Sequence, residues 1–480
     1  MKILTKIFVL LSMVVLIGCS NQFVHKAELD GLDSKEILLE QIESAAEFRG
    51  TQYEIVEHTL ENGLTVLIVE KPTMPVVSVQ VWYKVGSINE TDGFKGIAHL
   101  FEHMMFRGSD NFGPQEHARL IKEAGGRCNA YTTDEVTVYH QKVPADKLAL
   151  VLRLEADRMD SLKLNQDILD TEGEVVKEEY RLRVDNDPIG SMERNVRRFL
   201  FPKHPYEFGP IGRMDDIAGF SVEDCRGFFE SFYAPNNAVL IVAGDVRAGQ
   251  VIELVESEFG SIGARSVDPG PELSLETSRV DLRKKAQTQL PIPVTVVALY
   301  TTGERDEDSI VLKLIINSLA KGRSSRLWRT LVREKKLAEY FVGEHIQGRE
   351  NGVVFFACAH LPFLSGKVKS AILGELEKIK AVGLEESEFV KARNRLSSQM
   401  MFQRYYVNSL ARGIGYSEVV RGDYRLFYQM AEKIEAVTQA DIIRVANKYF
   451  TKDNVRVIYF EPKEGIFLAG LAGFIKSIFY

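Results

Sequence analysis

The sequence predicts an α+β protein made of two homologous domains, each a mostly antiparallel sheet with helices packed on one face. At 480 residues the chain is too long for one hydrophobic core and suits two or more domains. Strand-like and helical patterns intermix without regular βαβ alternation, which favours an antiparallel sheet. The chain also repeats itself, because an offset of 217 residues superimposes Tyr233–Asn237 on Phe450–Asn454 and Gly86 on Gly303. The second half is therefore expected to repeat the architecture of the first.

The first half opens with β-type segments and continues with an apolar helix. Glu61-Asn62-Gly63 lies between two short β-rich runs and is typical of a hairpin turn. The helix is expected to have about four turns, because its apolar residues recur at helical spacing between two glycines. In chain order we expect a hairpin over Ile55–Glu70, a strand at Val76–Val85, the helix within Gly93–Gly108, a helix at Pro114–Ala124 and a strand at Asn129–Val143.

Three polar residues, His99, Glu102 and His103, interrupt this apolar helix. A spacing of four residues brings both imidazoles to one face, where they can reach one ion at the zinc–nitrogen distance of roughly 2.0–2.1 Å. Glu102 lies on nearly the same face and is placed to act as a general base without being a ligand. Such residues are commonly solvated or hydrogen-bonded instead, but in an apolar helix unpaired polar groups are costly unless they hold something. The order His-x-x-Glu-His is that of the inverzincins.

This motif is one of several that occur in a defined order. They are His99–His103 followed by Phe106 and Gly108, then Gly125–Thr132, Glu172–Glu179, His204–Tyr206 and Phe232–Val246. The arrangement resembles the pitrilysin-type (M16, inverzincin) zinc metallopeptidases, in particular the short two-domain members related to mitochondrial processing peptidase. The resemblance covers nearly all of the chain after residue 50. It implies one Zn²⁺ per chain and hydrolysis of peptide bonds.

A catalytic zinc commonly has three protein ligands and one position for water, so a third ligand is needed. The helical stretch Gln166–Val184 offers four carboxylates, at Glu172, Glu174, Glu178 and Glu179. The resemblance selects Glu179 as the third ligand and Glu172 as a residue that orients a ligand from behind. A solvated acidic face is the alternative for all four, and it is the expectation for Glu174 and Glu178.

The resemblance also implies residues that bind substrate. Asn129 and Ala130 match the family's edge strand, which takes a peptide as an added strand through unpaired backbone groups. Arg333 and Tyr340, seven residues apart, match an arginine and a tyrosine that hold substrate in the family. The alternatives are an ordinary sheet strand for the first pair, and a surface charge with a packed ring for the second.

The metal motif is missing from the second copy of the repeat. The positions equivalent to His99, Glu102 and His103 are Ile316, Leu319 and Ala320. If the polar residues merely held the fold, the second copy would be expected to keep them. The chemistry is therefore assigned to the first half.

The N-terminus has the pattern of a bacterial lipoprotein. Lys2 and Lys6 precede the apolar run Ile7–Ile17, which is typical of a secretory signal and too short for a membrane span. Leu16-Ile17-Gly18-Cys19 resembles a lipobox, which implies cleavage before Cys19 and a lipid on that cysteine. A secretory signal with an incidental cysteine is the alternative. Ser20, in place of an aspartate, favours the outer membrane, with the enzyme facing the periplasm.

These observations divide the chain into five segments. They are a lipoprotein signal peptide at 1–18, a tether and lead-in at 19–50, a zinc-binding peptidase domain at 51–260, a linker at 261–273 and a second homologous domain without the metal site at 274–480. The apolar tail from 465 to 480 is too short for a confident membrane span. The remaining cysteines, Cys128, Cys225 and Cys358, form neither a disulfide framework nor a thiolate metal site.

The expected function is that of a zinc-dependent endopeptidase, anchored by lipid and acting on peptides or unfolded segments. The formal net charge of −7 gives no general attraction to nucleic acid. A homodimer is expected, because two domains form half of the four-domain chamber of long family members. In it, Arg333 and Tyr340 would face a zinc site across the cavity. The rival interpretation is a non-catalytic family member that acts as a binding or assembly subunit.

Overall fold

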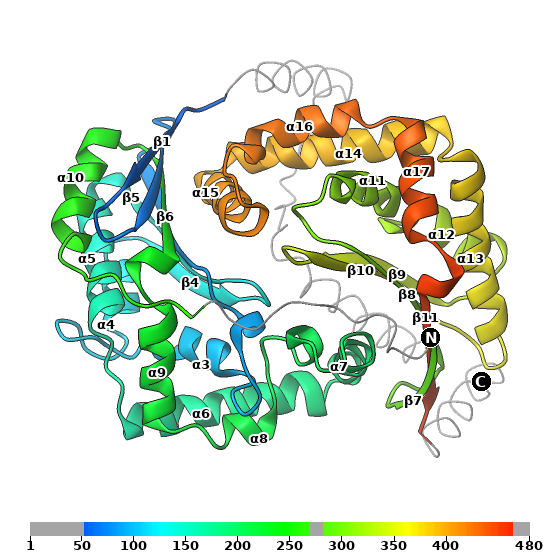
Figure 1. The fold of residues 1–480 in the computed structure, drawn as a ribbon, viewed down its shortest axis with the longest axis horizontal. Helices are drawn as coiled ribbons and strands as arrows, with labels where there is room; N and C mark the ends of the chain where they lie inside the picture. The colour runs from blue at the N-terminus through cyan, green and yellow to red at the C-terminus, as the bar shows by residue number, and fades with distance from the viewer. Residues whose placement is uncertain (1–51, 269–281, 464–480) are drawn as a thin grey trace, which may run out of the picture.

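The structure, a computed structural model, describes residues 52–268 and 282–463, and these form two sheets (Figure 1). The first half contributes β1 (Ile55–Thr59), β2 (Thr65–Glu70), β3 (Val76–Tyr83), β4 (Arg127–Thr132), β5 (Thr137–Pro144) and β6 (Ala238–Gly244). The second contributes β7 (Arg283–Thr288), β8 (Val294–Thr302), β9 (Tyr340–Gln347), β10 (Asn351–Ala359) and β11 (Val455–Pro462). The strand orders are β1-β2-β6-β3-β5-β4 and β7-β11-β8-β10-β9.

Helices occupy most of the remaining described chain. Those of the first half are α3 (Ile97–Met104), α4 (Glu116–Glu123), α5 (Leu148–Asp160), α6 (Gln166–Tyr180), α7 (Pro188–Leu200), α8 (Met214–Ile217), α9 (Val222–Phe232) and α10 (Ala248–Phe259). Those of the second are α11 (Asp308–Ala320), α12 (Arg326–Trp328), α13 (Ser365–Val382), α14 (Glu386–Tyr405), α15 (Val407–Tyr416), α16 (Leu426–Ala436) and α17 (Gln439–Tyr449). Wider π-helical turns follow α6, α12 and α15, at Arg181–Asp185, Arg329–Glu334 and Ser417–Arg421.

The two halves repeat one architecture, as the sequence offset predicts. Strands β2, β6, β3, β5 and β4 correspond in order to β7, β11, β8, β10 and β9, and in each sheet only the first of these pairs is parallel. α9 and α17 begin at equivalent positions, and both are started by a capping box, in which a hydroxyl and a carboxylate satisfy free backbone N–H groups. The prediction of an α+β chain with two homologous, mostly antiparallel sheets is confirmed.

Two predicted elements differ from those in the structure. α3 has eight residues instead of about four turns, because Gly96 enters it with a φ of 105° and the chain leaves the helix after Met104. The strand predicted at Asn129–Val143 is the hairpin of β4 and β5. Its turn is closed by Thr133, whose hydroxyl accepts the backbone N–H groups of Glu135 and Val136 at 3.1 and 3.0 Å.

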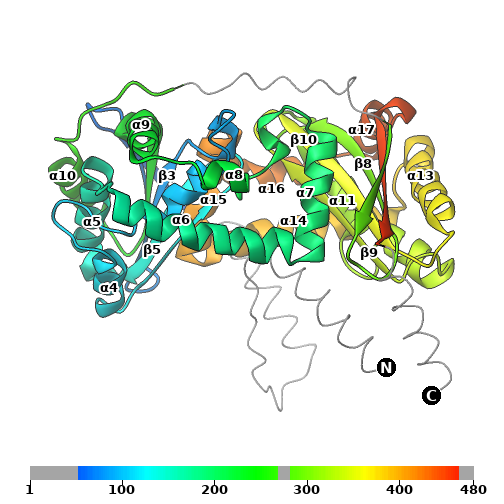
Figure 2. The same cartoon turned by 90° about the horizontal axis from the view of Figure 1, so that it is seen from below.

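One helix of each half packs on the sheet of the other half. α15 buries Leu410 and Ile414 against the first sheet, in a cluster with Trp82 and Ile241. Conversely, α7 packs on the second sheet, and Figure 2 shows it standing against that sheet at the end of α6. Its buried residues Met192, Phe199 and Leu200 lie in a cluster with Val296, Tyr300 and Phe460. Each sheet therefore carries its own helices on one face and a helix from the other half on the second face.

Several predictions concern segments outside the described residues. These are the signal peptide at 1–18, the lipidation site Cys19, the tether at 19–50 and the tail from 465 to 480. The predicted linker at 261–273 is described only as far as residue 268. The three described cysteines are unpaired, as expected. Within 52–268 and 282–463, the helices are all too short or too polar to cross a membrane.

Candidate metal centre

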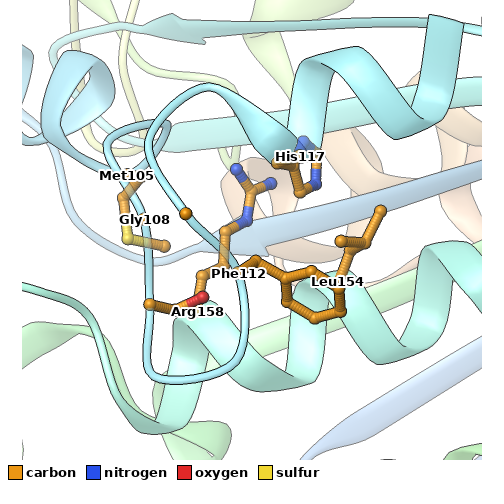
Figure 3. A pocket seen from close by; sticks show the side chains of 8 residues that line it. Met105, Gly108, Phe112, His117, Leu154 and Arg158 are labelled. Carbon is orange, nitrogen blue, oxygen red and sulfur yellow. The ribbon is translucent and has the colours of Figure 1, made fainter.

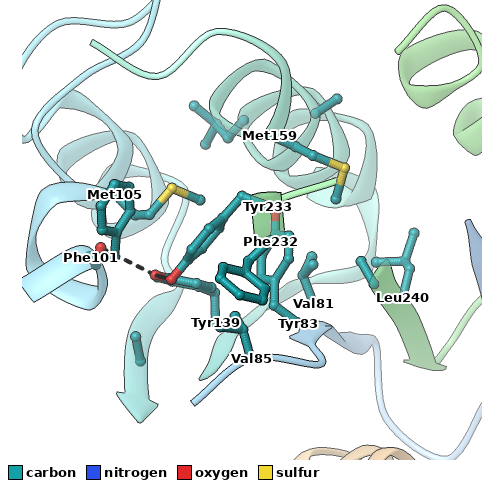
Figure 4. Close-up of a cluster of buried hydrophobic side chains, with 14 of the residues drawn as sticks. Val81, Tyr83, Val85, Phe101, Met105, Tyr139, Met159, Phe232, Tyr233 and Leu240 are labelled. Atoms are coloured by element: carbon teal, nitrogen blue, oxygen red, sulfur yellow. Dashed lines mark hydrogen bonds between the residues drawn. The ribbon is translucent and has the colours of Figure 1, made fainter. Parts of the chain in front are cut away.

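α3 is fixed at its start and along its buried face. At its start, the Glu90 carboxylate accepts the backbone N–H groups of Gly96 and Ala98 at 2.9 and 3.0 Å. Along its apolar face, Phe101 packs among aromatic rings that include Tyr233 (Figure 4). The Tyr139 hydroxyl donates to the Phe101 carbonyl at 3.3 Å. Because this face is buried, the opposite face of the helix presents its polar residues toward α6.

Three of the predicted residues meet between α3 and α6. His99 Nε2 lies 3.6 Å from Glu179 Oε2, and His103 Nε2 lies 3.5 Å from the same oxygen. One ligand atom from each of these residues lies within 4.8 Å of the others, and among the described residues this is the group able to hold a metal. The helical spacing of four residues brings the two imidazoles together, and the packing of α6 on α3 adds the carboxylate.

The charges of the three groups differ although they face one another. Burial lowers the pKa of His99, so this imidazole is neutral at pH 7, the form that ligates a metal. Burial also opposes the charged form of His103, but its contacts with Glu172 and Glu179 outweigh that effect and raise its pKa to about 9. The His103 contact holds the pKa of Glu179 well below its usual range. The two histidines differ because His103 faces two carboxylates and is less buried.

Glu102 stands beside the cluster on the same helix. Its Oε2 accepts a hydrogen bond of 2.7 Å from the hydroxyl of Thr132, the last residue of β4. Burial raises the pKa of Glu102, and this hydrogen bond opposes the rise. A carboxylate with a raised pKa, held by one hydrogen bond and adjacent to a metal ligand, is suited to accept and return a proton.

Two arginines, Arg107 and Arg183, pair with the carboxylates of this site, and neither was predicted from the sequence. Glu172 Oε2 lies 3.5 Å from His103 Nδ1, and its Oε1 lies 2.5 Å from Arg107 Nε. Glu172 is thus placed behind a histidine, where the resemblance implies an orienting residue. Arg183 Nη2 lies 2.7 Å from Glu179 Oε1, which leaves Oε2 to face the histidines. The spacing of four residues between Glu179 and Arg183 could have predicted their pairing on one helix. The pairing of Arg107 with Glu172 could not be predicted in this way, because it depends on how α6 packs on α3.

The cluster fits a zinc ion in its donors and in their spacing. Two imidazole nitrogens and one carboxylate oxygen are a donor set of catalytic zinc sites. Two atoms bound tetrahedrally to one zinc lie about 3.3–3.4 Å apart. The Nε2 atoms of His99 and His103 lie 3.6 and 3.5 Å from the shared Glu179 oxygen, so a small adjustment suffices. The three cysteines that the structure describes lie outside this group, so none of them supplies a thiolate ligand.

The other predicted site residues are dispersed. β4 is the outer strand of the first sheet, with Asn129 exposed and Ala130 buried. Arg333 is exposed in the turn after α12, and Tyr340 is half-buried at the start of β9. Within the described parts of this chain, neither residue bonds to the histidine–glutamate cluster, and their role stays a prediction. Glu174 and Glu178 are exposed and pair with Lys177 and Arg181, as expected of a solvated face.

A small cavity lies under the loop that follows α3, away from the metal cluster. Met105, Phe112, His117 and Leu154 line it together with Arg158, and Figure 3 shows their side chains around it. The Arg158 guanidinium lies over the Tyr139 ring at 4.3 Å and bonds to the buried Glu155. These contacts hold the Arg158 side chain in place at the cavity wall. None of the three candidate ligands lines the cavity.

A histidine pair and a glutamate on adjoining helices, beside a sheet of this topology, are the arrangement expected of the inverzincin class. The chain belongs to peptidase family M16. The family description "Insulinase (Peptidase family M16)" matches residues 65–206, and "Peptidase M16 inactive domain" matches residues 219–396. The first match contains the candidate ligands His99, His103 and Glu179. The second contains α11, which lacks such residues at the equivalent positions.

Proteins of this family from several organisms are similar to the chain. The zinc protease PqqE of Helicobacter pylori is 30% identical over 84% of this chain and 92% of its own length. The probable mitochondrial-processing peptidase subunit beta of Arabidopsis thaliana is 24% identical over 84% of this chain and 78% of its own. These relatives confirm the predicted resemblance.

Two solved structures share the fold. The crystal structure of a protease from H. pylori matches with a TM-score of 0.80 and 28% identity, over 86% of this chain and all (100%) of the other. The periplasmic protease PqqL of Escherichia coli matches with a TM-score of 0.70 and 18% identity, over 88% of this chain and 50% of the other. The second likeness is one of fold alone.

Proposed function

We propose that this chain is a zinc-dependent endopeptidase that hydrolyses peptides or unfolded protein segments in the bacterial cell envelope. The observation that carries the proposal is the convergence of His99 Nε2, His103 Nε2 and Glu179 Oε2. Glu102 stands beside them, one hydrogen bond away from the outer strand of the sheet. In this proposal the metal ligands, the general base and the peptide-binding edge are neighbours.

In this proposal His99, His103 and Glu179 hold zinc, and Glu172 with Arg107 orients His103 from behind. When bound, zinc polarises the scissile carbonyl and makes water acidic enough to react near pH 7. Glu102 takes a proton from the attacking water as the water oxygen bonds to the carbonyl carbon. Glu102 then gives that proton to the amide nitrogen as the carbon–nitrogen bond breaks. The products are a carboxylic acid and an amine, which become carboxylate and ammonium by exchange of one proton, and no covalent enzyme intermediate is formed.

The outer strand β4 supports an extended peptide as the substrate. Its free backbone edge offers hydrogen bonds to an added strand, which gives affinity with little dependence on peptide sequence. Asn129 and Ala130 are the residues proposed for this contact. Because α3 lies beside β4 and Thr132 reaches Glu102, a peptide paired with β4 would pass directly over the general base.

We also propose that two copies assemble around the site and that Cys19 carries a lipid. The chain matches 50% of the PqqL chain, so two copies correspond to one chain of that length. One chain carries both the candidate zinc ligands and the Arg333–Tyr340 pair, which supports a homodimer over a dimer of two different subunits. The lipobox-like Leu16–Cys19 supports an anchored protein facing the periplasm, and PqqL is itself described as a periplasmic protease. Tyr340→Phe should reduce turnover without changing zinc content, and sedimentation should find a dimer.

The deciding experiment compares wild type with Glu102→Gln, using a quenched peptide library and metal analysis. We expect one zinc per chain in both proteins, hydrolysis by wild type alone, and loss of hydrolysis after chelation. Glu178→Gln, on the solvated face of α6, is the control and should behave as wild type. Wild type that holds zinc but binds peptides without cleaving them would instead support a binding or assembly subunit. Hydrolysis by Glu102→Gln at the wild-type rate would refute the role of Glu102.

A further inference from the structure

Equivalent hairpin turns of the two halves meet where the two halves face each other. The turn between β4 and β5 spans residues 133–136, and the turn between β9 and β10 spans 348–350. In Figure 1 the tips of both hairpins point toward each other. The backbone N–H of Arg349, in the second turn, donates to Glu135 Oε1 at 3.1 Å, and its side-chain Nε donates to Glu135 Oε2. The half without metal ligands thus contacts the turn that ends the outer strand β4.

Glu135 needs this partner because it is almost fully buried. Its side chain is 7% exposed, and the Arg349 side chain is 23% exposed. Besides Arg349, Glu135 is bonded by the hydroxyl of Tyr206, which is neutral. An ionised carboxylate at such depth is costly unless a cation compensates it. Arg349 is the cation bonded to Glu135 among the described residues, so compensation of the Glu135 charge depends on the second half.

The first half holds the same turn from its other side. Asp134 accepts hydrogen bonds from the Ser87 hydroxyl at 2.8 Å and from Arg197 Nη1 at 3.1 Å. Gly86 approaches so closely that a Cβ atom on it would lie 2.5 Å from the Thr133 carbonyl oxygen. Thr132, which bonds Glu102, directly precedes this turn. A displacement of the turn would therefore displace the Thr132 hydroxyl and the end of β4.

The second turn is itself firmly attached to its sheet. The backbone N–H of Gly303 donates to the Glu350 carbonyl at 2.9 Å, and that of Glu304 donates to the Gly348 carbonyl at 2.8 Å. Both donors follow β8, the central strand of the second sheet. Arg349 is thus carried by a supported backbone, which suits it to fix the position of another segment.

We propose that Arg349 is a positioning residue for peptide cleavage, which acts from the second half by fixing the turn after β4. Through Glu135 it sets the end of the peptide-binding edge and the Thr132 hydroxyl that holds Glu102. This inference rests on the proposed peptidase function. It gives the half without metal ligands a part in the reaction within the same chain, separate from the role proposed for Arg333 and Tyr340.

The test compares Arg349→Met with Arg305→Met in the full chain. Arg305 lies at the same end of the second sheet, where it donates to the Val420 carbonyl at 3.2 Å and pairs with Glu350. That carboxylate is 54% exposed, so removing Arg305 leaves no buried charge uncompensated. We expect Arg349→Met to keep its zinc and to lose about tenfold or more in kcat/KM, since small misplacements of reacting groups are costly. Arg305→Met should stay within about twofold of wild type, because exposed ion pairs contribute little.

A second readout does not depend on activity. Hydrogen exchange in the metal-free protein should become faster at the amides of β4 and its turn in Arg349→Met, and not in Arg305→Met. The double variant Glu135→Gln/Arg349→Met removes the uncompensated charge. It should regain the thermal midpoint of wild type without regaining kcat/KM. It also keeps the inference testable if Arg349→Met folds poorly.

Unchanged exchange at β4, or activity that returns together with stability in the double variant, would overturn the inference. These outcomes differ from failure of the proposed function. If wild type neither binds zinc nor cleaves peptides, the peptidase proposal fails, while the exchange measurement still reports whether Arg349 fixes the turn.

Discussion

The helix α3 of the first half and its counterpart α11 of the second occupy the same place in the repeated fold but differ in every residue of the site. His99, Glu102 and His103 correspond to Ile316, Leu319 and Ala320, and on the neighbouring helix Glu172 and Glu179 correspond to Phe389 and Leu396. All the residues of the second set are apolar, and four of the five are fully buried or nearly so. The fold therefore forms around aliphatic and aromatic side chains at these positions. The repeated architecture thus does not require polar residues at these positions, which supports the proposed metal site of the first half.

The largest effect is expected when the first half receives the helix residues of the second. The triple variant His99→Ile, Glu102→Leu, His103→Ala should retain no zinc by elemental analysis and no measurable peptidase activity. Above pH 9, where protonated His103 no longer stabilises the wild type, the thermal midpoint of the variant should equal or exceed that of metal-free wild type, because apolar groups replace desolvated polar ones. A variant that fails to fold would show that the two helices are not interchangeable in the fold, and the comparison would be wrong.

A smaller effect is expected at Glu172, which contacts His103 but is not a candidate ligand. Glu172→Gln should weaken zinc binding by about 10–100-fold, the usual cost of removing a residue that orients a ligand. Competition with a chelator of known affinity would measure it. Glu174→Gln is the matched control, since Glu174 lies on the same helix and is 66% exposed. Equal zinc affinities for the two variants would remove Glu172 from the site.

Arg183 should have a weaker influence, because its side chain is 62% exposed and solvent screens its charge. Arg183→Gln frees Glu179 Oε1 and is expected to weaken zinc binding by about threefold to tenfold. The difference from wild type should shrink as salt is added. Arg181→Gln, two residues away and paired with the exposed Glu178, should have no effect. An identical response of both variants would indicate only a general effect of charge.

The smallest effect concerns pH in the metal-free protein, where the second half has no titrating counterpart of His103. The pKa of His103 is raised from its ordinary 6.5 to about 9 by Glu172 and Glu179. Protonated His103 therefore stabilises the folded state fully below pH 6.5, and this contribution is lost as pH rises through 9. Urea unfolding of wild type and His103→Gln should differ most at pH 6 and converge above pH 9. A constant difference across this range would contradict the assignment of the shift to His103.

Much of the site was predictable because it depends on the spacing of residues within one helix. His99 and His103 follow helical periodicity, and the offset between the halves revealed the apolar counterparts. Glu179 was available only through family resemblance, since nothing local separates it from the neighbouring glutamates. The structure brings it to the histidines by packing α6 on α3.

Contacts between segments that are distant in the chain could not be predicted from the sequence. The pairing of Arg107 with Glu172, and of Arg349 with Glu135, depends on tertiary packing that no spacing encodes. α7 is recognisably amphipathic, but its pattern does not indicate that its apolar face covers the sheet of the other half. The short length of α3 also follows from a left-handed glycine at its start, where apolar periodicity alone predicts a longer helix.

The exchange of α7 and α15 between the halves has a mechanical consequence. Pulling the two sheets apart would strip Leu410 and Ile414 from the first sheet and Phe199 and Leu200 from the second, exposing apolar surface on both at once. Because each sheet is covered by a helix from the other half, separating the two halves would cost the burial of both apolar contacts. In the proposed dimer, a gap that admits a peptide would then open between the two chains and not between the two halves of one chain.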